Sequence, residues 1–246
     1  MNKPNQILNE NKRRIDERLE AGLKLLRRTY RVTACPVDPV LSAPVIGGRP
    51  HHAQRYDIEG VGNLLVMTVK EAEANQLSSF VIMPYAKNLP LFSTDFVYSG
   101  EKRFFLLEIY DLSVHPDAAF DAGIEAFRAF GSSLSDLQDI PTRPAWYDSI
   151  RPVCYAKAFG PEQDGLAIKR FLEFLERFVA MEQSTQALTG DDLTEKWRKN
   201  KAYADRLIDA GGVSTDLFTA ALGAENTRRF FHEVFFGADW YRPQGV

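Results

Sequence analysis

The chain has 246 residues, 45% of them hydrophobic and 26% charged, so it can bury a full core and does not have the composition of a disordered protein. A formal net charge of -3 argues against a nucleic-acid-binding protein, which needs a basic surface. No apolar run approaches the roughly 20 residues that span a bilayer, and the amino terminus lacks the apolar core of a signal peptide, so we expect a cytoplasmic protein with no membrane partner. Because there is no linker-like segment and no internal repeat, we expect one domain over residues 1–246.

Near the amino terminus, apolar residues recur at helical spacing. Between Gln6 and Tyr30 they are three or four positions apart, which predicts an amphipathic helix with the apolar face Ile15, Leu19, Leu23, Leu26 and Tyr30. The same pattern leaves charged residues for solvent, among them Lys12, Arg13, Arg14, Glu17 and Arg18. A loop region rich in Pro and Gly follows, from residue 36 to residue 50.

The middle of the chain is predicted to form strands. Short apolar or β-branched runs alternate with turn-forming segments, and the runs are Leu64–Val69, Phe80–Pro84, Asp95–Ser99 and Arg103–Leu112. Connections this short favour antiparallel neighbours. Phe104–Leu107 is apolar at every position, which predicts a central strand covered on both faces.

Helical patterns return in the second half of the chain. The expected elements are a helix with Phe120, Ile124, Phe127 and Phe130 on one face, a strand over Pro152–Phe159, a well-buried helix over Asp164–Met181, and two or three helices over Asp192–Ile208 and Thr215–Phe236 with breaks at Gly211-Gly212 and Gly223. Helices before and after an antiparallel meander predict an α+β fold, a three-layer α/β/α sandwich with a central antiparallel sheet.

The common cofactor and metal motifs are missing. Gly60-Val61-Gly62 lacks the third glycine of a dinucleotide fingerprint, and His232-Glu233 lacks a second histidine at zinc-protease spacing. Cys35 and Cys154 lie far apart without a CxxC motif, so they cannot hold an iron–sulfur cluster by themselves, and a disulfide between them is possible but not implied. The sequence therefore predicts neither a metal site nor a bound organic cofactor.

The central block of the chain carries a more specific pattern. Phe80–Pro84 is followed by Leu89–Val97 with the sequence LPLFSTDFV, by Gly100, and by the apolar strand that ends in Asp111-Leu112. Further along, in order, come Ile150–Tyr155, a long helix, Ala221–Glu225 and Phe230–Phe236. Over roughly residues 50 to 237, this order of motifs resembles that of the ferredoxin-dependent bilin reductases.

The resemblance implies both a fold and an activity. Members of that family are α/β/α sandwiches that hold a linear tetrapyrrole, such as biliverdin, between the sheet and the C-terminal helices. They use no bound cofactor: electrons arrive singly from reduced ferredoxin (or flavodoxin), and side chains supply protons to substrate radicals, as in phycobilin biosynthesis. Asp95 matches the family's central aspartate, and a carboxylic acid in an apolar pocket has a raised pKa and can hold a proton near neutrality.

The resemblance also suggests further acids. Asp209 lies close to a second aspartate that some relatives use, and Glu59 is an alternative acid. The best-known member has a histidine where this chain has Ser79, and a glutamate that falls near Met67 or Thr68. Neither replacement is a comparable acid, so we expect Asp95 to be the principal proton donor.

Other polar residues have candidate binding roles. Ser79 either donates a hydrogen bond to a bilin carbonyl or ends a turn. Arg103 and Arg151 are predicted to pair with bilin propionates, because a guanidinium matches the geometry of a carboxylate. The basic run Lys196–Lys201 and Arg228-Arg229 are either solvated helix faces or a docking surface for an acidic ferredoxin.

Two alternatives remain at this point. Instead of a ferredoxin-dependent reductase of a bilin, the chain is either a tetrapyrrole-binding protein without catalytic activity or a reductase of a different tetrapyrrole catabolite, as in the related red chlorophyll catabolite reductases.

Overall fold

A computed structural model describes residues 3–71, 75–211 and 213–246. Its centre is an eight-stranded sheet in the order β1-β4-β5-β6-β7-β8-β10-β9, in which every neighbouring pair is antiparallel. The strands are β1 (Val32–Cys35), β4 (His52–Ile58), β5 (Gly62–Val69), β6 (Asn75–Pro84), β7 (Leu91–Ser99), β8 (Lys102–Tyr110), β9 (Gln138–Asp139) and β10 (Val153–Phe159), and β2 (Val45–Ile46) pairs with β3 (Arg49–Pro50) in a separate hairpin.

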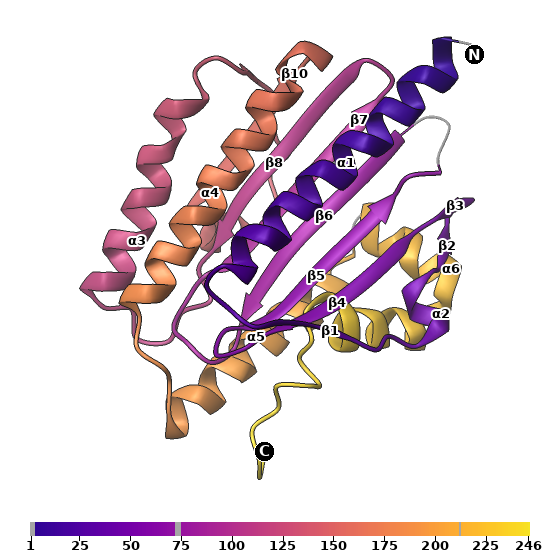
Figure 1. Ribbon diagram of the computed structural model, residues 1–246. Helices are drawn as coiled ribbons and strands as arrows, with labels where there is room; N and C mark the ends of the chain where they lie inside the picture. Colours follow the sequence, from indigo (N-terminus) through magenta and orange to yellow (C-terminus); the bar gives the residue numbers. More distant parts are fainter. Residues whose placement is uncertain (1–2, 72–74, 212) are drawn as a thin grey trace.

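Helices cover both faces of this sheet, as the sequence predicts for a three-layer sandwich. Figure 1 shows α1, α3 and α4 side by side over one face and α5 and α6 against the other. The helices are α1 (Lys3–Arg27), the short α2 (Pro39–Ser42), α3 (Ala118–Ala129), α4 (Asp164–Ser184), α5 (Gly190–Asp209) and α6 (Val213–Arg229). Short 3-10 helices are η1 (Phe130–Leu134), η2 (Trp146–Ile150) and η3 (Pro161–Gln163), and the π-helix η4 (Phe230–Phe235) continues α6.

Alternation along each strand separates two hydrophobic cores. On the α1 face, Phe80, Phe92, Phe96 and Phe105 pack against α1, α3 and α4. On the α5 face, Leu65, Val81, Leu91 and Tyr110 pack against α5, α6 and η4. Successive residues of a strand therefore contact opposite helical layers.

The predicted helices agree with the structure. Ile15, Leu19 and Leu26 are buried on α1, as their spacing predicts. The predicted exposure of Arg18 is wrong: its side chain is fully buried between α1 and the sheet, where it contacts Ser78 and Phe96. Gly223 interrupts α6 with a φ of 76°, a conformation that glycine adopts without strain, so the predicted break is confirmed. Gly211 ends α5 with a φ of 69°, whereas its neighbour Gly212 lies outside the described residues.

Two predictions about the sheet need correction. The sequence prediction left out Val32–Cys35 and His52–Ile58, which form β1 and β4 at one edge of the sheet. Phe104–Leu107 is not covered on both faces: Phe105 and Leu107 are fully buried on the α1 face, but Phe104 and Leu106 on the α5 face are half-buried. The reason is that α5, α6 and η4 cover only part of their face.

Candidate functional site

Asp95 lies in the middle of β7, on the α5 face of the sheet. Its cross-strand partner on β6 is Ser79, whose hydroxyl donates a hydrogen bond of 2.5 Å to Oδ1 of Asp95. Both strands are paired on either side, so the two side chains are held at the centre of the sheet. Ser79 is therefore a mid-strand residue directly bonded to the candidate acid, and it does not end a turn.

Around Asp95, the α5 face of the sheet is left partly open. Eight side chains that point to this face from four adjacent strands are half-buried, whereas most of their neighbours on the α1 face are buried. We call these residues the open sheet surface: Leu77, Ser93, Asp95, Val97, Phe104, Leu106, Cys154 and Ala158. Most of them are apolar, so the surface offers a flat apolar area with a carboxyl group near its middle.

A second carboxylate, Glu108, lies beside the open sheet surface. It is on β8 directly opposite Ser93, two pairs along the ladder from Asp95 and its partner Leu106 and on the same face of the sheet. Its Oε1 pairs with Arg151 at 2.5 Å, and both side chains are 8% exposed. Arg151 also pairs with Asp148 and lies 5.1 Å from the ring centre of Tyr147. The arrangement brings Asp95, Ser79 and Arg151 to one region of one face and adds Glu108.

The pKa values of both carboxyl groups are raised. Burial raises the pKa of Asp95, and the hydrogen bond from Ser79 and the positive charge of Arg18 oppose that rise. Burial also raises the pKa of Glu108, and the negative charge of Asp95 adds to it, against the pairing with Arg151. Two carboxyl groups that disfavour each other's ionisation form an arrangement that can hold a proton.

Aromatic side chains border this region near the end of β8. Tyr110 lies 5.6 Å from both Tyr147 and Tyr203 between ring centres, and Trp146 lies 5.7 Å from Tyr203. The thiol of Cys154 is 3.7 Å from Oε1 of Glu108, and burial raises its pKa to about 11, so it stays protonated at neutral pH. Planar rings and an apolar floor suit a flat conjugated ligand.

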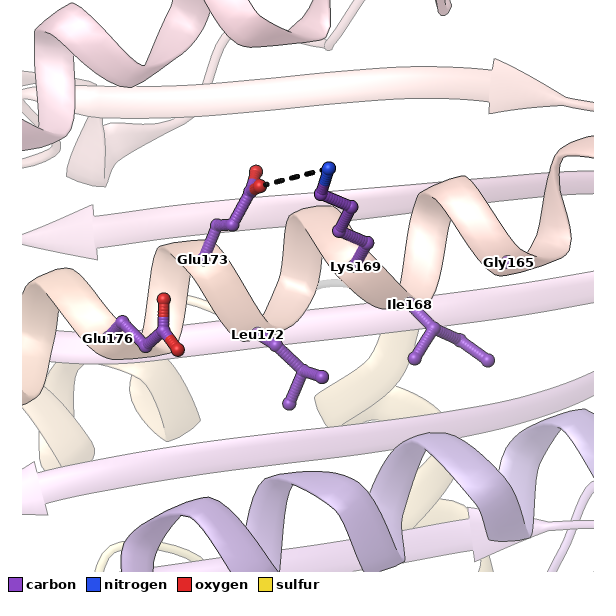
Figure 2. Close-up of a pocket in the computed structure, with 6 residues that line it drawn as sticks. All are labelled: Gly165, Ile168, Lys169, Leu172, Glu173 and Glu176. Atoms are coloured by element: carbon purple, nitrogen blue, oxygen red, sulfur yellow. Dashed lines mark ion pairs between the residues drawn. The ribbon is translucent and has the colours of Figure 1, made fainter.

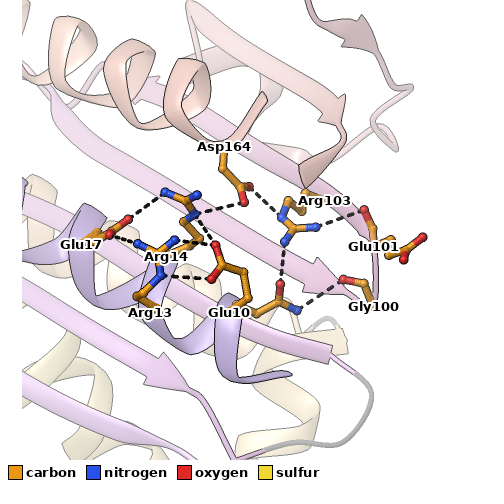
Figure 3. A network of polar contacts seen from close by, with 9 residues as sticks. Glu10, Arg13, Arg14, Glu17, Gly100, Glu101, Arg103 and Asp164 are labelled. Atoms are coloured by element: carbon orange, nitrogen blue, oxygen red, sulfur yellow. Dashed lines mark hydrogen bonds and ion pairs between the residues drawn. The ribbon is translucent and has the colours of Figure 1, made fainter. Parts of the chain in front are cut away.

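Arg103 is not part of this region. It lies on β8 with the parity of Phe105, so its side chain points to the α1 face, where it is 2% exposed. There it pairs with Asp164 at 2.7 Å and donates to Asn11 at 2.7 Å, within the network of Figure 3. Its donors are directed at protein groups on the face opposite Asp95, so Arg103 is not placed to bind a propionate of a bilin on the open sheet surface.

Asp209 and Glu59 are also separated from Asp95. Asp209 ends α5 with its side chain 65% exposed and paired with Arg228 at 3.0 Å. The residues of α5 that are buried against the sheet layer include Trp197, Asn200 and Tyr203 instead. Glu59 is exposed in the turn between β4 and β5. The geometry gives neither carboxylate a place on the open sheet surface.

The basic segments are largely committed to internal contacts. Lys196 is fully buried, and its Nζ donates to the carbonyls of Leu89 and Leu112 at 2.6 and 2.9 Å. Lys201 pairs with Asp205, and Arg228 pairs with Asp205 and Asp209. The interpretation of residues 196–201 as one solvated basic face is therefore wrong for Lys196, because the helix turns that side chain toward the sheet.

A surface groove of about 410 Å³ lies elsewhere on the molecule. All of its lining residues belong to α4, and Figure 2 shows Lys169 and Glu173 paired across one side of it. Because α4 covers the opposite face of the sheet, the groove is separate from Asp95. Its walls come from a single helix, so it does not gather groups from different elements as a catalytic site does.

The described residues contain no cluster of three or more His, Cys, Asp or Glu side chains placed to hold a metal ion. Within the same residues, no helix is long and apolar enough to cross a membrane.

Among the comparisons with known proteins, the match comes from solved structures. No family model and no curated protein matches the chain. A crystal structure of phytochromobilin synthase from tomato in complex with biliverdin superimposes with a TM-score of 0.72, at 10% sequence identity, covering 93% of this chain and 85% of that one. That protein is a ferredoxin-dependent bilin reductase. The sequence resemblance is thus confirmed at the level of the fold, and so is the α+β sandwich.

Proposed function

We propose that this chain, which has the fold of a ferredoxin-dependent bilin reductase, is an oxidoreductase that reduces a linear tetrapyrrole such as biliverdin. The single observation that carries the proposal is the position of Asp95: a carboxyl group with a raised pKa in the middle of an otherwise largely apolar, partly open sheet surface. A flat, conjugated and largely apolar substrate fits that surface, and the carboxyl can hold a proton for it.

The proposed chemistry needs electrons and protons in equal number. Reduced ferredoxin or flavodoxin supplies one electron to the bound tetrapyrrole, and Asp95 donates a proton to the radical that forms. A second electron and a second proton then complete the reduction of one double bond. Ser79 holds the carboxyl of Asp95 in place, and Glu108 lies close enough to influence its charge.

Arg151 has a separate proposed role at the border of the site. Its guanidinium already pairs with Glu108 and Asp148, and it carries five N–H donors in a planar fork. We assign it to binding an acidic substituent of the substrate, such as a propionate. The proposed function gives no role to Arg103 or Asp209, because both side chains lie away from the open sheet surface.

The test is an anaerobic assay with biliverdin and a reduced ferredoxin system, followed by absorption spectroscopy. The wild-type protein should convert the bilin spectrum through radical intermediates, and Asp95→Asn should bind the bilin but stall before product. Asp121→Asn is a matched control, because Asp121 is an exposed carboxylate on α3 at the opposite face.

The same assay separates the alternatives. Binding without turnover in the wild-type protein would favour a tetrapyrrole carrier, and turnover of only a different tetrapyrrole would identify another substrate. If no tetrapyrrole binds, the proposed function is wrong.

A further inference from the structure

Arg18 is a charged residue buried without a carboxylate partner in the described part of the chain. It lies on α1, is 0% exposed, and Nη2 donates to the carbonyl oxygen and the hydroxyl of Ser78 at 3.1 and 2.6 Å. Its Nε and Nη1 have no hydrogen-bond partner among the described residues. A buried charge without a counter-charge is costly, so its retention calls for an explanation.

The contacts of Arg18 flank the Ser79–Asp95 pair. Its guanidinium carbon lies 4.0 Å from the ring centre of Phe96, the residue after Asp95. Ser78, which accepts its hydrogen bonds, is the residue before Ser79. Ser78 and Phe96 are themselves cross-strand partners, adjacent in the ladder to Ser79 and Asp95. Successive side chains alternate between faces, so Arg18 contacts the reverse side of the two strands where they carry the candidate acid.

We infer that Arg18 is a positioning residue for Asp95: from the opposite face it fixes the β6–β7 pair that carries the Ser79–Asp95 hydrogen bond, and it places an unpaired positive charge behind the carboxyl. This inference rests on the proposed function, in which Asp95 holds and then releases a proton. A positive charge in a low-dielectric layer acts over a longer range than one in water. It favours the carboxylate and so makes the proton easier to release.

The charges around Asp95 agree with this role. Burial is the largest influence and raises its pKa, whereas the Ser79 hydrogen bond and the charge of Arg18 lower it. Glu108 on β8 is the nearby acid and is itself paired with Arg151. Burial lowers the pKa of Arg18 to about 10, with Tyr98 and Asp95 opposing that shift, so the guanidinium remains charged at neutral pH.

A purely structural role is the competing explanation, because Arg18 also stands 4.8 Å from the ring centre of Phe171 on α4 and so joins the helical layer to the sheet. The two roles differ in what they do to Asp95. An anchor affects the free energy of unfolding, whereas a positioning charge also affects the protonation of a carboxyl on the other face.

The test follows the protonated carboxyl of Asp95 by infrared spectroscopy in protein without ligand, as a function of pH. The band that disappears in Asp95→Asn identifies the group. In Arg18→Met, which keeps the side-chain length but removes the charge, the midpoint of that band should move to higher pH. Arg18→Lys, which restores a charge, should return it toward the wild-type midpoint. Arg18→Gln replaces Arg18→Met if the latter does not fold, with the same expected shift.

Ile15→Ala is the matched packing control, because Ile15 is fully buried on the same face of α1 and carries no charge. It should lower the free energy of unfolding but leave the midpoint unchanged. An unchanged midpoint in Arg18→Met and Arg18→Gln, or an equal shift in Ile15→Ala, overturns the inference. The infrared experiment uses no tetrapyrrole, so its result does not depend on the turnover assay. If the wild-type protein does not turn over a tetrapyrrole, the proposed reductase activity is wrong, but the infrared midpoints of the variants are unaffected.

Discussion

Ser79 and Asp95 are direct cross-strand partners at the centre of the sheet, joined by a hydrogen bond from the serine hydroxyl to the carboxyl oxygen Oδ1. The hydrogen bond thus joins β6 to β7, the two middle strands of the eight-stranded sheet, and holds a candidate proton donor there. The hydrogen bond stabilises the charged form of the acid, while burial stabilises the neutral form. The balance between the two sets the pH range in which Asp95 can carry a proton.

Ser79→Ala should raise the pKa of Asp95 further, because the charged form loses a donor. A raised pKa in the folded state stabilises the protein at low pH, and that stabilisation is lost as the pH rises from the unfolded value of 3.8 through the folded pKa. In Ser79→Ala the loss should extend to higher pH. Urea unfolding between pH 4 and 7 measures it. Ser93→Ala, on the same face and strand as Asp95, is the control and should keep the wild-type profile.

Arg151→Met should destabilise the protein by about 3–5 kcal/mol, because Glu108 is left as an unpaired buried charge. The double variant Glu108→Gln/Arg151→Met should cost clearly less than the sum of the two single changes. Denaturant unfolding of the four proteins gives the coupling energy. Asp148→Asn removes a more exposed partner of Arg151, 42% exposed, and should cost at most about 1 kcal/mol. Additive single changes would contradict the pairing.

Arg103→Met tests the separation of the two faces. The Arg103–Asp164 pair is 2% exposed on both sides, so removing the cation should destabilise the protein by about 3–5 kcal/mol. Because the pair lies on the α1 face, the dissociation constant of biliverdin should stay within about twofold, a change of about 0.4 kcal/mol. Titration of the folded variant measures it. A large loss of affinity for biliverdin in Arg103→Met would mean that Arg103 contributes to binding the tetrapyrrole.

Lys196 gives a second pH-dependent prediction. Burial lowers its pKa to about 7, so above that pH the folded protein holds fewer protons than the unfolded chain, whose lysine keeps its proton to the ordinary 10.5. The free energy of unfolding should therefore rise with pH between about 7 and 9, by at most about 1.4 kcal/mol per pH unit. Lys196→Met should flatten this rise. A slope that survives in Lys196→Met would assign it to another group.

Part of the candidate site could be predicted from the sequence, and the remaining part depends on how β7 and β8 are paired residue by residue. The LPLFSTDFV motif indicates Asp95, and the match of a guanidinium to a propionate suggests Arg151. The turn between β7 and β8 determines the face of the sheet on which Arg103 and Glu108 lie. Ser99 pairs with Lys102 across Gly100 and Glu101, so Asp95 is opposite Leu106. Asp95 therefore shares its face with the even-numbered residues of β8. That rule puts Glu108 beside Asp95 and Arg103 on the reverse side. It could be applied only once the turn was known to have two residues.

Other features depended on contacts between distant segments. Asp209 lies near a family position along the chain, yet the direction of its side chain is set by Arg228 on α6. Lys196 belongs to a run that looks solvent-exposed, and only the carbonyls of Leu89 and Leu112, more than eighty residues away, show why it is buried. The edge strands β1 and β4 are short or mostly polar and contain no strongly hydrophobic run, so a search for apolar runs does not find them.

The break of α6 at Gly223 and the wide turn of η4 make the helical layer less regular than the sheet, so we expect the helical layer to accept substitutions more readily during evolution. The acids stand on paired central strands, where a shift in one backbone disturbs several ladders at once. On the same side of the sheet, α6 and η4 pack over β2, β4 and β5. Gly223 interrupts α6, and the side-chain amide of Asn63 donates to the carbonyls of Val234 and Phe235 at the π-helix. Substitutions in this helical layer can therefore change what borders the open sheet surface while Asp95 keeps its place on the sheet. Under the proposed function, new substrate preferences should arise there without loss of the strands that hold Asp95.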